Sequence, residues 1–411
     1  MKHILRINSY LYYLIPFVLL TGPFLPDLFL TFIAISSTLI ILKKKEFDYF
    51  KNYFFIIFII FYLFLIISSL SSDFIVFSLS TSIVYLRFGL FVIATIYLIN
   101  SNNNFIKNFT NILIVTYLFV LASGYFQFFF GFNLIGIEST SSRLNLPLSD
   151  NQIIGGYLAR VFPLLLGLIF YTYKLHFKQY VFILLLFIFT DILVYLSGER
   201  TALALICIAS LAIIIFLKNF KTLRILSFLI SILCIIIITI TNPSIKERNL
   251  DKTIDQLGVN DSRINIFSIH HESIFKGAYK IFLDNKLIGS GPNNFRNLCN
   301  KEEYNINQIT CSTHPHNTYI QILAELGLIG LFIFLLAIAP IIFSTIMHFI
   351  YIIKNERKLT DCQVCLMVSI LLIIWPVLPT LNFFNNWINI LYFLPIGFYL
   401  HTVYTIDQEN Y

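Results

Sequence analysis

The sequence predicts an all-α protein that crosses a membrane about twelve times. Of its 411 residues, 58% are hydrophobic and only 12% are charged, whereas a soluble domain averages about 25% charged residues. Apolar runs recur from end to end, and the mean hydropathy is +0.82. The 44 phenylalanines and 23 tyrosines suit lipid-facing helix sides and interfacial belts. We therefore expect one membrane domain.

Twelve apolar segments are expected to be transmembrane helices, because each approaches the roughly 20 residues that a helical crossing needs. The first run follows Lys2 and Arg6 as in a signal peptide, but no small-residue cleavage site follows it, so we expect a retained first helix. Gly22, Pro23 and Pro26 predict a tight hairpin or a re-entrant pair between the first two segments. The twelve are residues 8–22, 27–42, 53–70, 82–99, 109–130, 153–172, 180–196, 201–217, 225–241, 327–351, 366–382 and 387–404.

Lysines and arginines are distributed unevenly between the two sets of connecting loops. Basic residues near helix ends tend to stay in the cytoplasm, and long loops are exempt from this rule. The short loops of one set hold only Arg143 and Arg200. The other set, which we expect to be cytoplasmic together with both termini, holds Lys2, Arg6, Lys43, Lys44, Lys45, Lys51, Lys107, Lys174, Lys178, Lys218, Lys221, Arg224, Lys354, Arg357 and Lys358.

This orientation divides the chain into three parts. Residues 1–241 are expected to hold transmembrane helices one to nine, and residues 242–315 a large loop on the outer side. Residues 316–411 are expected to hold a re-entering amphipathic helix and helices ten to twelve. The net charge of +7 is spread over short clusters between the spans, which indicates topology signals rather than a nucleic-acid surface.

Two arginines stand where an arginine is costly. Arg200 lies between two predicted spans with almost no loop, and Arg87 lies inside the span 82–99. An arginine at a helix centre costs about 2.5–3.5 kcal/mol on insertion scales, so such residues usually face a partner or a cavity. Arg200 is therefore a candidate site residue; the alternative is a snorkelling side chain paired with Glu199. For Arg87, structural pairing and function both stay open.

The long loop supplies the remaining candidates. Arg263 follows Asp261-Ser262, and Gly289-Ser290-Gly291 predicts a tight turn because glycines allow positive φ and close backbone approach. Pro315 suits the first turn of a helix, so His316 is expected at the start of an amphipathic helix entering the membrane. A histidine there can exchange protons near neutral pH. His314 and His316 as metal ligands are disfavoured, because no partner at ligand spacing stands nearby.

Several of these stretches, in this order, resemble the O-antigen ligase and polymerase superfamily of bacterial envelope glycosyltransferases. Each motif alone is weak, but their order and membrane sidedness together are specific, over most of residues 130–335. The stretches are Arg143-Leu144 to Gly156-Tyr157-Leu158, Ser197-Gly198-Glu199-Arg200-Thr201-Ala202, Asp261-Ser262-Arg263, Gly289-Ser290-Gly291-Pro292-Asn293-Asn294-Phe295, and His316-Asn317-x-Tyr319 through Glu325-x-Gly327-x-x-Gly330.

The resemblance implies transfer of a glycan from an undecaprenyl-diphosphate carrier to an acceptor hydroxyl, at the periplasmic face of a bacterial inner membrane. It also implies a fold similar to that of the multi-spanning GT-C-type glycosyltransferases, which use lipid-linked donors without a metal or other cofactor. The acceptor would be lipid A–core in a ligase of lipopolysaccharide biosynthesis, or a second lipid-linked repeat unit in a polymerase. The motifs favour the ligase.

The chemistry of the residues suits that reaction. Arg200 and Arg263 are expected to stabilise the leaving diphosphate, because a guanidinium binds phosphate oxygens bidentately and stays charged. His316 is expected to take the acceptor hydroxyl's proton as general base. Glu199 is expected to orient Arg200, and His314 to orient or substitute for His316. The family segments add Arg143, Asn317, Gly289 and Gly291 as candidate substrate-binding residues.

Two points remain open from the sequence. Cys299 and Cys311 bracket the segment before His314, and an oxidising compartment favours a disulfide between them. Cys362 and Cys365 lack a thioredoxin-like context and are interpreted as structural. A transporter of lipid-linked glycans is the alternative from a different class, but it should show repeats and broken helices near the midplane.

Overall fold

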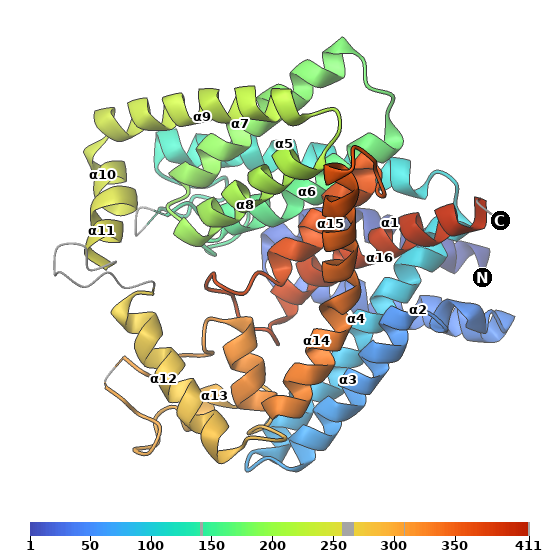
Figure 1. Cartoon of the computed structure of the whole chain (residues 1–411), viewed down its shortest axis with the longest axis vertical. Helices are drawn as coiled ribbons and strands as arrows, with labels where there is room; N and C mark the ends of the chain where they lie inside the picture. Colours follow the sequence, from blue (N-terminus) through green and yellow to red (C-terminus); the bar gives the residue numbers. More distant parts are fainter. Residues whose placement is uncertain (140–142, 257–266, 308, 410–411) are drawn as a thin grey trace.

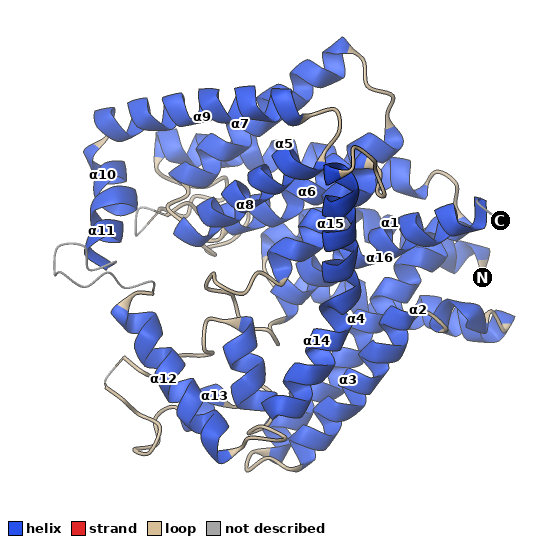
Figure 2. Ribbon diagram, in the orientation of Figure 1, coloured by secondary structure: helices blue, strands red, loops and turns tan. Residues whose placement is uncertain are grey.

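The chain folds into a helical bundle with a smaller helical lobe at one end. The computed structural model describes residues 1–139, 143–256, 267–307 and 309–409. In these residues the regular secondary-structure elements are helices (Figure 2). Nine helices are long and apolar enough to cross a membrane. They are α1 (Lys2–Val18, continued by a turn Leu19–Thr21), α2 (Phe24–Lys44), α3 (Tyr53–Leu70), α4 (Ile75–Ser101), α5 (Phe105–Phe130), α6 (Ile154–Thr172), α7 (Phe177–Leu196), α9 (Lys221–Thr241) and α14 (Thr318–Ile353).

Three further helices complete the bundle. The apolar helices α8 (Arg200–Phe216) and α15 (Asp361–Ile373) are shorter, and α16 (Asn386–Glu409) ends the described chain. Each of the twelve predicted spans overlaps one helix, so the polytopic all-α class is confirmed for the described residues. The number of crossings stays a prediction, and so does the likeness to GT-C-type enzymes.

The connections between these helices gather at two opposite ends of the bundle. At one end, called the site side below, the backbone N–H of Leu144 donates to the carbonyl of Ser197 at 3.3 Å, and Ser72 Oγ donates to the carbonyl of Ser290 at 2.8 Å. At the other, the basic side, the N–H of Lys218 donates to Asp361 at 3.0 Å. Among the described residues, the site side comprises 19–23, 71–74, 131–139, 143–153, 197–199, 242–256, 267–307, 309–317 and 374–385; the basic side comprises 45–52, 102–104, 173–176, 217–220 and 354–360.

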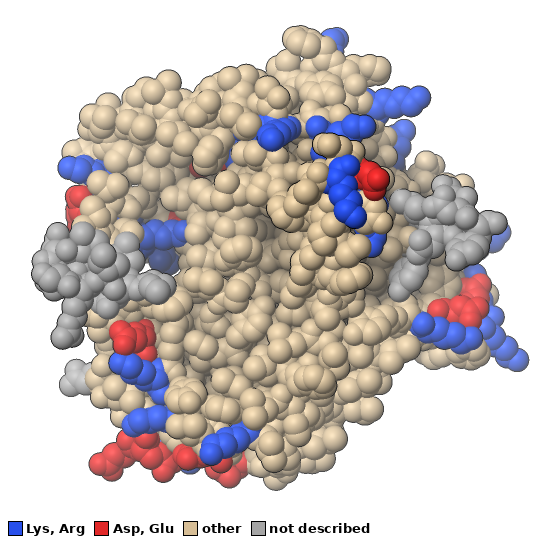
Figure 3. All heavy atoms as spheres, viewed as in Figure 1, with Lys and Arg blue, Asp and Glu red and all other residues tan. Residues whose placement is uncertain are grey.

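Charged side chains follow the same division. Both termini lie at the right edge in Figure 1, and the helices of the long loop lie at the left edge. Figure 3 shows Lys, Arg, Asp and Glu gathered at the lower left, at the right edge and along the upper part of the view, with a broad uncharged surface between them. Charged ends flanking an apolar belt are what a membrane-spanning bundle requires, because lipid tails do not solvate charge.

The long loop forms a lobe that packs on the outer part of α14. It contains α10 (Pro243–Lys246), a π-helical turn (Glu247–Asp251), α11 (Lys252–Gln256), α12 (Ile269–Asp284) and α13 (Phe295–Leu298). Ile274, Ala278 and Ile281 of α12 are fully buried against Phe295 and Ala324, which gives the lobe a small core of its own. A disulfide joins Cys299 to Cys311, the pair singled out in the sequence, with their Cα atoms 4.9 Å apart.

The predicted helix 366–382 is wrong at its end. Helix α15 stops at Ile373, and residues 374–385 form an irregular segment on the site side. Pro376 and Pro379 lie in this segment, and proline both lacks the N–H of the helical ladder and clashes with the preceding turn. Hydropathy detects the apolar character of the segment but not this break.

Arg224 corrects the predicted set of cytoplasmic basic residues. Its side chain is fully buried in α9 and donates to both carboxylate oxygens of Asp191 in α7, at 2.7 and 2.9 Å. Its guanidinium also lies 4.4 Å from the ring centroid of Phe187. A buried arginine needs such an ion pair, since an uncompensated charge in the membrane is costly. Arg224 therefore joins two helices rather than marking a cytoplasmic loop.

Candidate active site

A pocket of about 640 Å³ opens on the site side, where the bundle meets the lobe. Four predicted site residues line it: Arg143, Glu199, Arg200 and His316. They come from the loop before α6, the α7–α8 junction and the residue before the N-cap of α14. The other walls are Gly156 and Arg160 of α6, Thr253 of α11, Ser268 and His271 at the start of α12, residues 377–381, and Trp387 of α16.

Arg200 begins α8 and points toward the lobe. Its Nη1 donates to Thr253 Oγ1 of α11 at 3.2 Å. Arg143 and Arg160 line the same pocket, and Arg248 lies nearby, with its Nη2 donating to the carbonyl of Gly198 at 3.4 Å. Burial lowers the pKa of Arg248, and the positive charges of Arg143 and Arg200 lower it further. The arginines thus create a concentrated positive potential in a concave site, as an anionic ligand requires.

Glu199 has partners other than the expected Arg200. Its carboxylate accepts the backbone N–H of Gly155 at 2.7 Å and that of Gly156 at 3.2 Å, at the amino end of α6. A Cβ on Gly155 would lie 2.3 Å from Ser197 Oγ, so glycine permits this approach. Burial raises the pKa of Glu199 to about 7, against the lowering effect of these hydrogen bonds. Glu199 therefore fixes α6 to the α7–α8 junction, between Arg200 and the other arginines.

His316 adopts a left-handed backbone conformation, with φ of 57°. A non-glycine residue in this region is uncommon and is maintained only where its surroundings determine it. Here the His316 carbonyl accepts the N–H of Thr380 at 2.8 Å, and Asn317 next to it caps α14. The Nε2 atom of His316 lies 3.0 Å from Ser312 Oγ. The constrained backbone thus directs the imidazole into the pocket.

Three histidines gather around this position. The ring of His316 lies 4.0 Å from that of His314 and 5.6 Å from that of His271, measured between centroids. Burial, together with His271 and His270, lowers the pKa of His316 to about 4. Burial and His316 lower the pKa of His314 to about 3. His316 is therefore neutral at pH 7 and has an accepting nitrogen, as a base requires.

His314 and Asn317 hold the segment that carries His316. His314 Nε2 lies 3.1 Å from the carbonyl of Thr380. Asn317 Oδ1 accepts the N–H groups of Tyr319 and Ile320, at 3.0 and 3.1 Å, and its Nδ2 donates to the carbonyl of Pro376 at 2.7 Å. A side chain that caps a helix in this way satisfies its free N–H groups. Both residues thereby attach α14 to the segment 374–385.

The glycine turn lies behind the pocket rather than among its lining residues. A Cβ on Gly289 would lie 2.3 Å from the backbone of Glu325, and one on Gly291 would lie 2.6 Å from Ser72 Cβ. The buried carboxylate of Glu325 accepts the N–H groups of Asn293 and Phe295, each at 3.0 Å. The turn and the Glu325-x-Gly327 motif therefore fit together and secure the lobe to α14.

Two other predicted arginines need separate mention. Arg263 lies outside the described residues, so its role stays a prediction. Arg87 of α4 pairs with Asp27 of α2, with Nη2 and Oδ1 2.9 Å apart. This ion pair joins adjacent helices. Of the two roles that the sequence left open for Arg87, structural pairing and function, it favours structural pairing.

Sequence reasoning missed Arg160, His271 and the segment 377–381. A signal for Arg160 was present, because it stands inside the predicted span 153–172, as Arg87 stands inside its own span. His271 carries no comparable signal, since only the packing of α12 against α14 brings it to the pocket. Across the parts of the chain that are described, no three His, Cys, Asp or Glu side chains form a cluster suited to a metal ion.

The fold and the pocket define a multi-pass membrane protein with an arginine- and histidine-lined site at one end of its helix bundle. A family model described as O-antigen ligase matches residues 180–335, which include Glu199, Arg200 and His316. This match supports, for these residues, the resemblance to the O-antigen ligase and polymerase superfamily. The family implies a glycosyltransferase- or ligase-type enzyme with lipid-linked glycan and polysaccharide substrates. No curated protein matches the chain.

Proposed function

We propose that the protein is an O-antigen ligase that transfers a glycan from undecaprenyl diphosphate to a hydroxyl of lipid A–core. The observation that carries the proposal is that Arg200 and His316 line one pocket at a single end of the bundle. A diphosphate-binding cation and a neutral imidazole are the two groups that glycosyl transfer from a lipid diphosphate needs. The family match supports the same class of reaction.

The orientation follows from the distribution of basic residues. The basic side holds Lys45, Lys51, Lys174, Lys218 and Lys354, and such residues favour the cytoplasm. We therefore assign the termini and the basic side to the cytoplasm of a bacterium, and the pocket to the periplasmic face of its inner membrane. The carrier's diphosphate lies at that face when its polyprenyl chain is in the bilayer.

The arginines act on the leaving group. The bond between the sugar's anomeric carbon and the phosphate oxygen breaks, and its electron pair stays with the lipid diphosphate. Arg200, with Arg143 and Arg160 beside it, neutralises the charge that develops there. Arg263 is proposed to contribute to the same charge stabilisation. Because these cations are in place before the reaction, little reorganisation is needed at the transition state.

His316 acts on the acceptor. The acceptor oxygen attacks the anomeric carbon as its proton passes to the imidazole, and the configuration of the sugar is inverted. Nε2 is hydrogen-bonded to Ser312, so we assign Nδ1 as the atom that takes the proton. A bound diphosphate supplies negative charge that stabilises the imidazolium and raises the pKa of His316 from about 4. Donor binding thereby strengthens the base.

A transporter of lipid-linked glycans is less well supported. An Arg87 that faced a continuous central cavity open to both sides would favour transport, whereas Arg87 pairs with Asp27 at 2.9 Å. The arginines that line the pocket, Arg143, Arg160 and Arg200, belong to one end of the bundle. Such one-sided placement suits an enzyme at the membrane edge.

Deletion in the native host, followed by surface-glycan profiling, tests the proposal. A ligase predicts free lipid A–core and accumulated long lipid-linked glycans, restored to normal by the wild-type chain but not by Arg200→Ala. Single repeat units on lipid A–core would instead identify a polymerase. Loss of the surface glycan with the lipid-linked donor trapped on the cytoplasmic face would indicate transport and contradict the proposal.

A further inference from the structure

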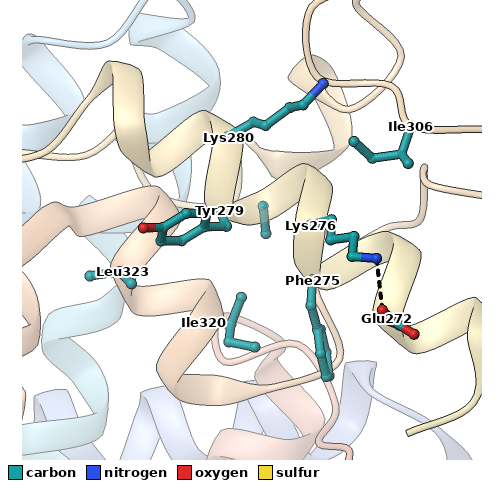
Figure 4. Close-up of a pocket in the computed structure, with 9 residues that line it drawn as sticks. Glu272, Phe275, Lys276, Tyr279, Lys280, Ile306, Ile320 and Leu323 are labelled. Atoms are coloured by element: carbon teal, nitrogen blue, oxygen red, sulfur yellow. Dashed lines mark ion pairs between the residues drawn. The ribbon is translucent and has the colours of Figure 1, made fainter. Parts of the chain in front are cut away.

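A second pocket, of about 460 Å³, lies between α12 and the outer turns of α14 (Figure 4). Phe275 and Tyr279 of α12 project toward Ile320 and Leu323 of α14 across it. Its other lining residues are Glu272, Lys276, Ala278, Lys280 and Ile306. The volume falls within the roughly 300–1,000 Å³ of small-molecule sites, and such pockets are mostly apolar.

The charged side chains that line this pocket already interact with other groups of the protein. Lys276 Nζ lies 2.7 Å from Glu272 Oε1, which is the dashed contact in Figure 4. Lys280 Nζ donates to the carbonyl of Glu303 at 3.1 Å. What the pocket offers a ligand is therefore hydrocarbon contact from aromatic and aliphatic side chains.

The second pocket begins close to His271 and His316. Phe275 follows His271 by four residues on α12, which is about one helical turn, or roughly 5.4 Å of rise. His316 precedes Asn317, the N-cap of α14, and Ile320 lies in the first turn of that helix. The starts of α12 and α14 thus present polar groups to the first pocket, and the residues that follow on each helix present apolar groups to the second.

An exposed apolar surface connects this pocket to the bilayer. Tyr279 and Leu283 are 53% and 42% exposed on α12, and Leu287 after it is 62% exposed. The carbonyl of Leu287 accepts the N–H of Ile329, and Phe332, one turn further along α14, is 62% exposed. The surface therefore continues onto the part of α14 that faces lipid.

We infer that the second pocket holds the first isoprene units of the donor's polyprenyl chain, an assignment that rests on the proposed glycosyl transfer. In a polyprenyl diphosphate, hydrocarbon is bonded directly to the diphosphate and so begins beside the reacting bond. In lipid A–core, sugars separate the accepting hydroxyl from the acyl chains. Only the donor places a hydrocarbon chain beside the reacting bond.

Ligand binding to the full-length protein in detergent tests this assignment, with inorganic diphosphate and farnesyl diphosphate as probes. The ratio of their Kd values measures the contribution of the chain. We expect farnesyl diphosphate to bind at least about tenfold more tightly to the wild type, as burial of several methylene groups gives. Leu323→Ser, which removes contacts, and Leu323→Trp, which fills the pocket, should each reduce that ratio about threefold or more. Neither should change the Kd of inorganic diphosphate.

Ile269→Ser is the matched control, because Ile269 is exposed on the same helix but does not line the pocket. An equal loss in this variant, or a ratio unaffected by both changes at Leu323, overturns the inference. Weaker binding of lipid A with an unchanged ratio would assign the pocket to the acceptor and also overturn it. Arg200→Ala separately tests the proposed function. If this variant binds inorganic diphosphate as tightly as the wild type does, the first pocket is not the diphosphate site, whatever the ratio of the two Kd values shows.

Discussion

The imidazole rings of His271 and His316 lie edge to face, with centroids 5.6 Å apart, where α12 and the start of α14 meet. His271 Nδ1 lies 2.8 Å from Ser268 Oγ, so its ring is fixed at the beginning of α12. His271 is one of the groups that lower the pKa of His316.

His271→Gln should therefore shift the acid limb of the pH–activity profile to higher pH. His316 acts as a base only when neutral, and a pKa of about 4 keeps the free enzyme active well below pH 6.5. Without His271, the pKa of His316 should rise, so kcat/KM should begin to fall at a higher pH as the solution is acidified. Transfer measured between pH 4.5 and 8 checks this, with His3→Gln, at the opposite end of the bundle, as control. An unshifted limb would exclude His271 as a determinant.

Glu199→Gln should flatten the dependence of stability on pH between about 4.5 and 7. Burial raises the folded-state pKa of Glu199 from 4.5 to about 7, so the folded protein binds the proton more tightly than the unfolded chain. Its stabilising contribution is present below pH 4.5 and is lost as the pH rises through 7. Thermal unfolding of the purified protein should show this loss in the wild type and in the exposed control Glu272→Gln. A wild-type slope in Glu199→Gln would contradict the assignment.

Glu325→Ala should destabilise the attachment of the lobe to α14. The change leaves the buried N–H groups of Asn293 and Phe295 without their acceptor, and each such group costs about 1–3 kcal/mol. Glu325→Gln keeps one carbonyl acceptor and should lose less. Protease digestion of the native protein should then cut residues 285–299 faster in Glu325→Ala than in Glu325→Gln. Equal protection in both variants would show that the carboxylate is not what secures the turn.

Removing one member of the buried ion pair Arg224–Asp191 should lower the stability of the protein more than replacing both members by apolar residues. Asp191→Leu alone leaves the Arg224 charge uncompensated and should cost about 3–5 kcal/mol. The double variant Asp191→Leu/Arg224→Met removes both charges and should recover most of that loss. Unfolding midpoints in detergent distinguish the cases. A double variant as unstable as Asp191→Leu would mean that the cation serves another purpose.

The sequence predicted the helical bundle and much of the site because both leave local signals. Hydropathy located a helix at each predicted span, and the cost of a membrane arginine drew attention to Arg200. The break of α15 has a local signal in Pro376 and Pro379, which hydropathy alone does not detect. The other features it missed depend on tertiary contact: the pairing of Arg224 with Asp191 and the approach of His271. The glycine turn was detected, but its contact with Glu325 becomes visible only when the lobe packs on α14. Short-range patterns carry no information on such long-range contacts.

The central claim is that Arg200 and His316 carry out one reaction, and transfer by the reconstituted full-length protein tests it most directly. With undecaprenyl-diphosphate-linked glycan and lipid A–core, His316→Ala should lower kcat about 10²–10⁴-fold, the usual contribution of a general base. Arg200→Lys should also be severely impaired, because lysine keeps the charge but lacks the bidentate geometry. Wild-type transfer by His316→Ala, or by Arg200→Lys, would contradict the account.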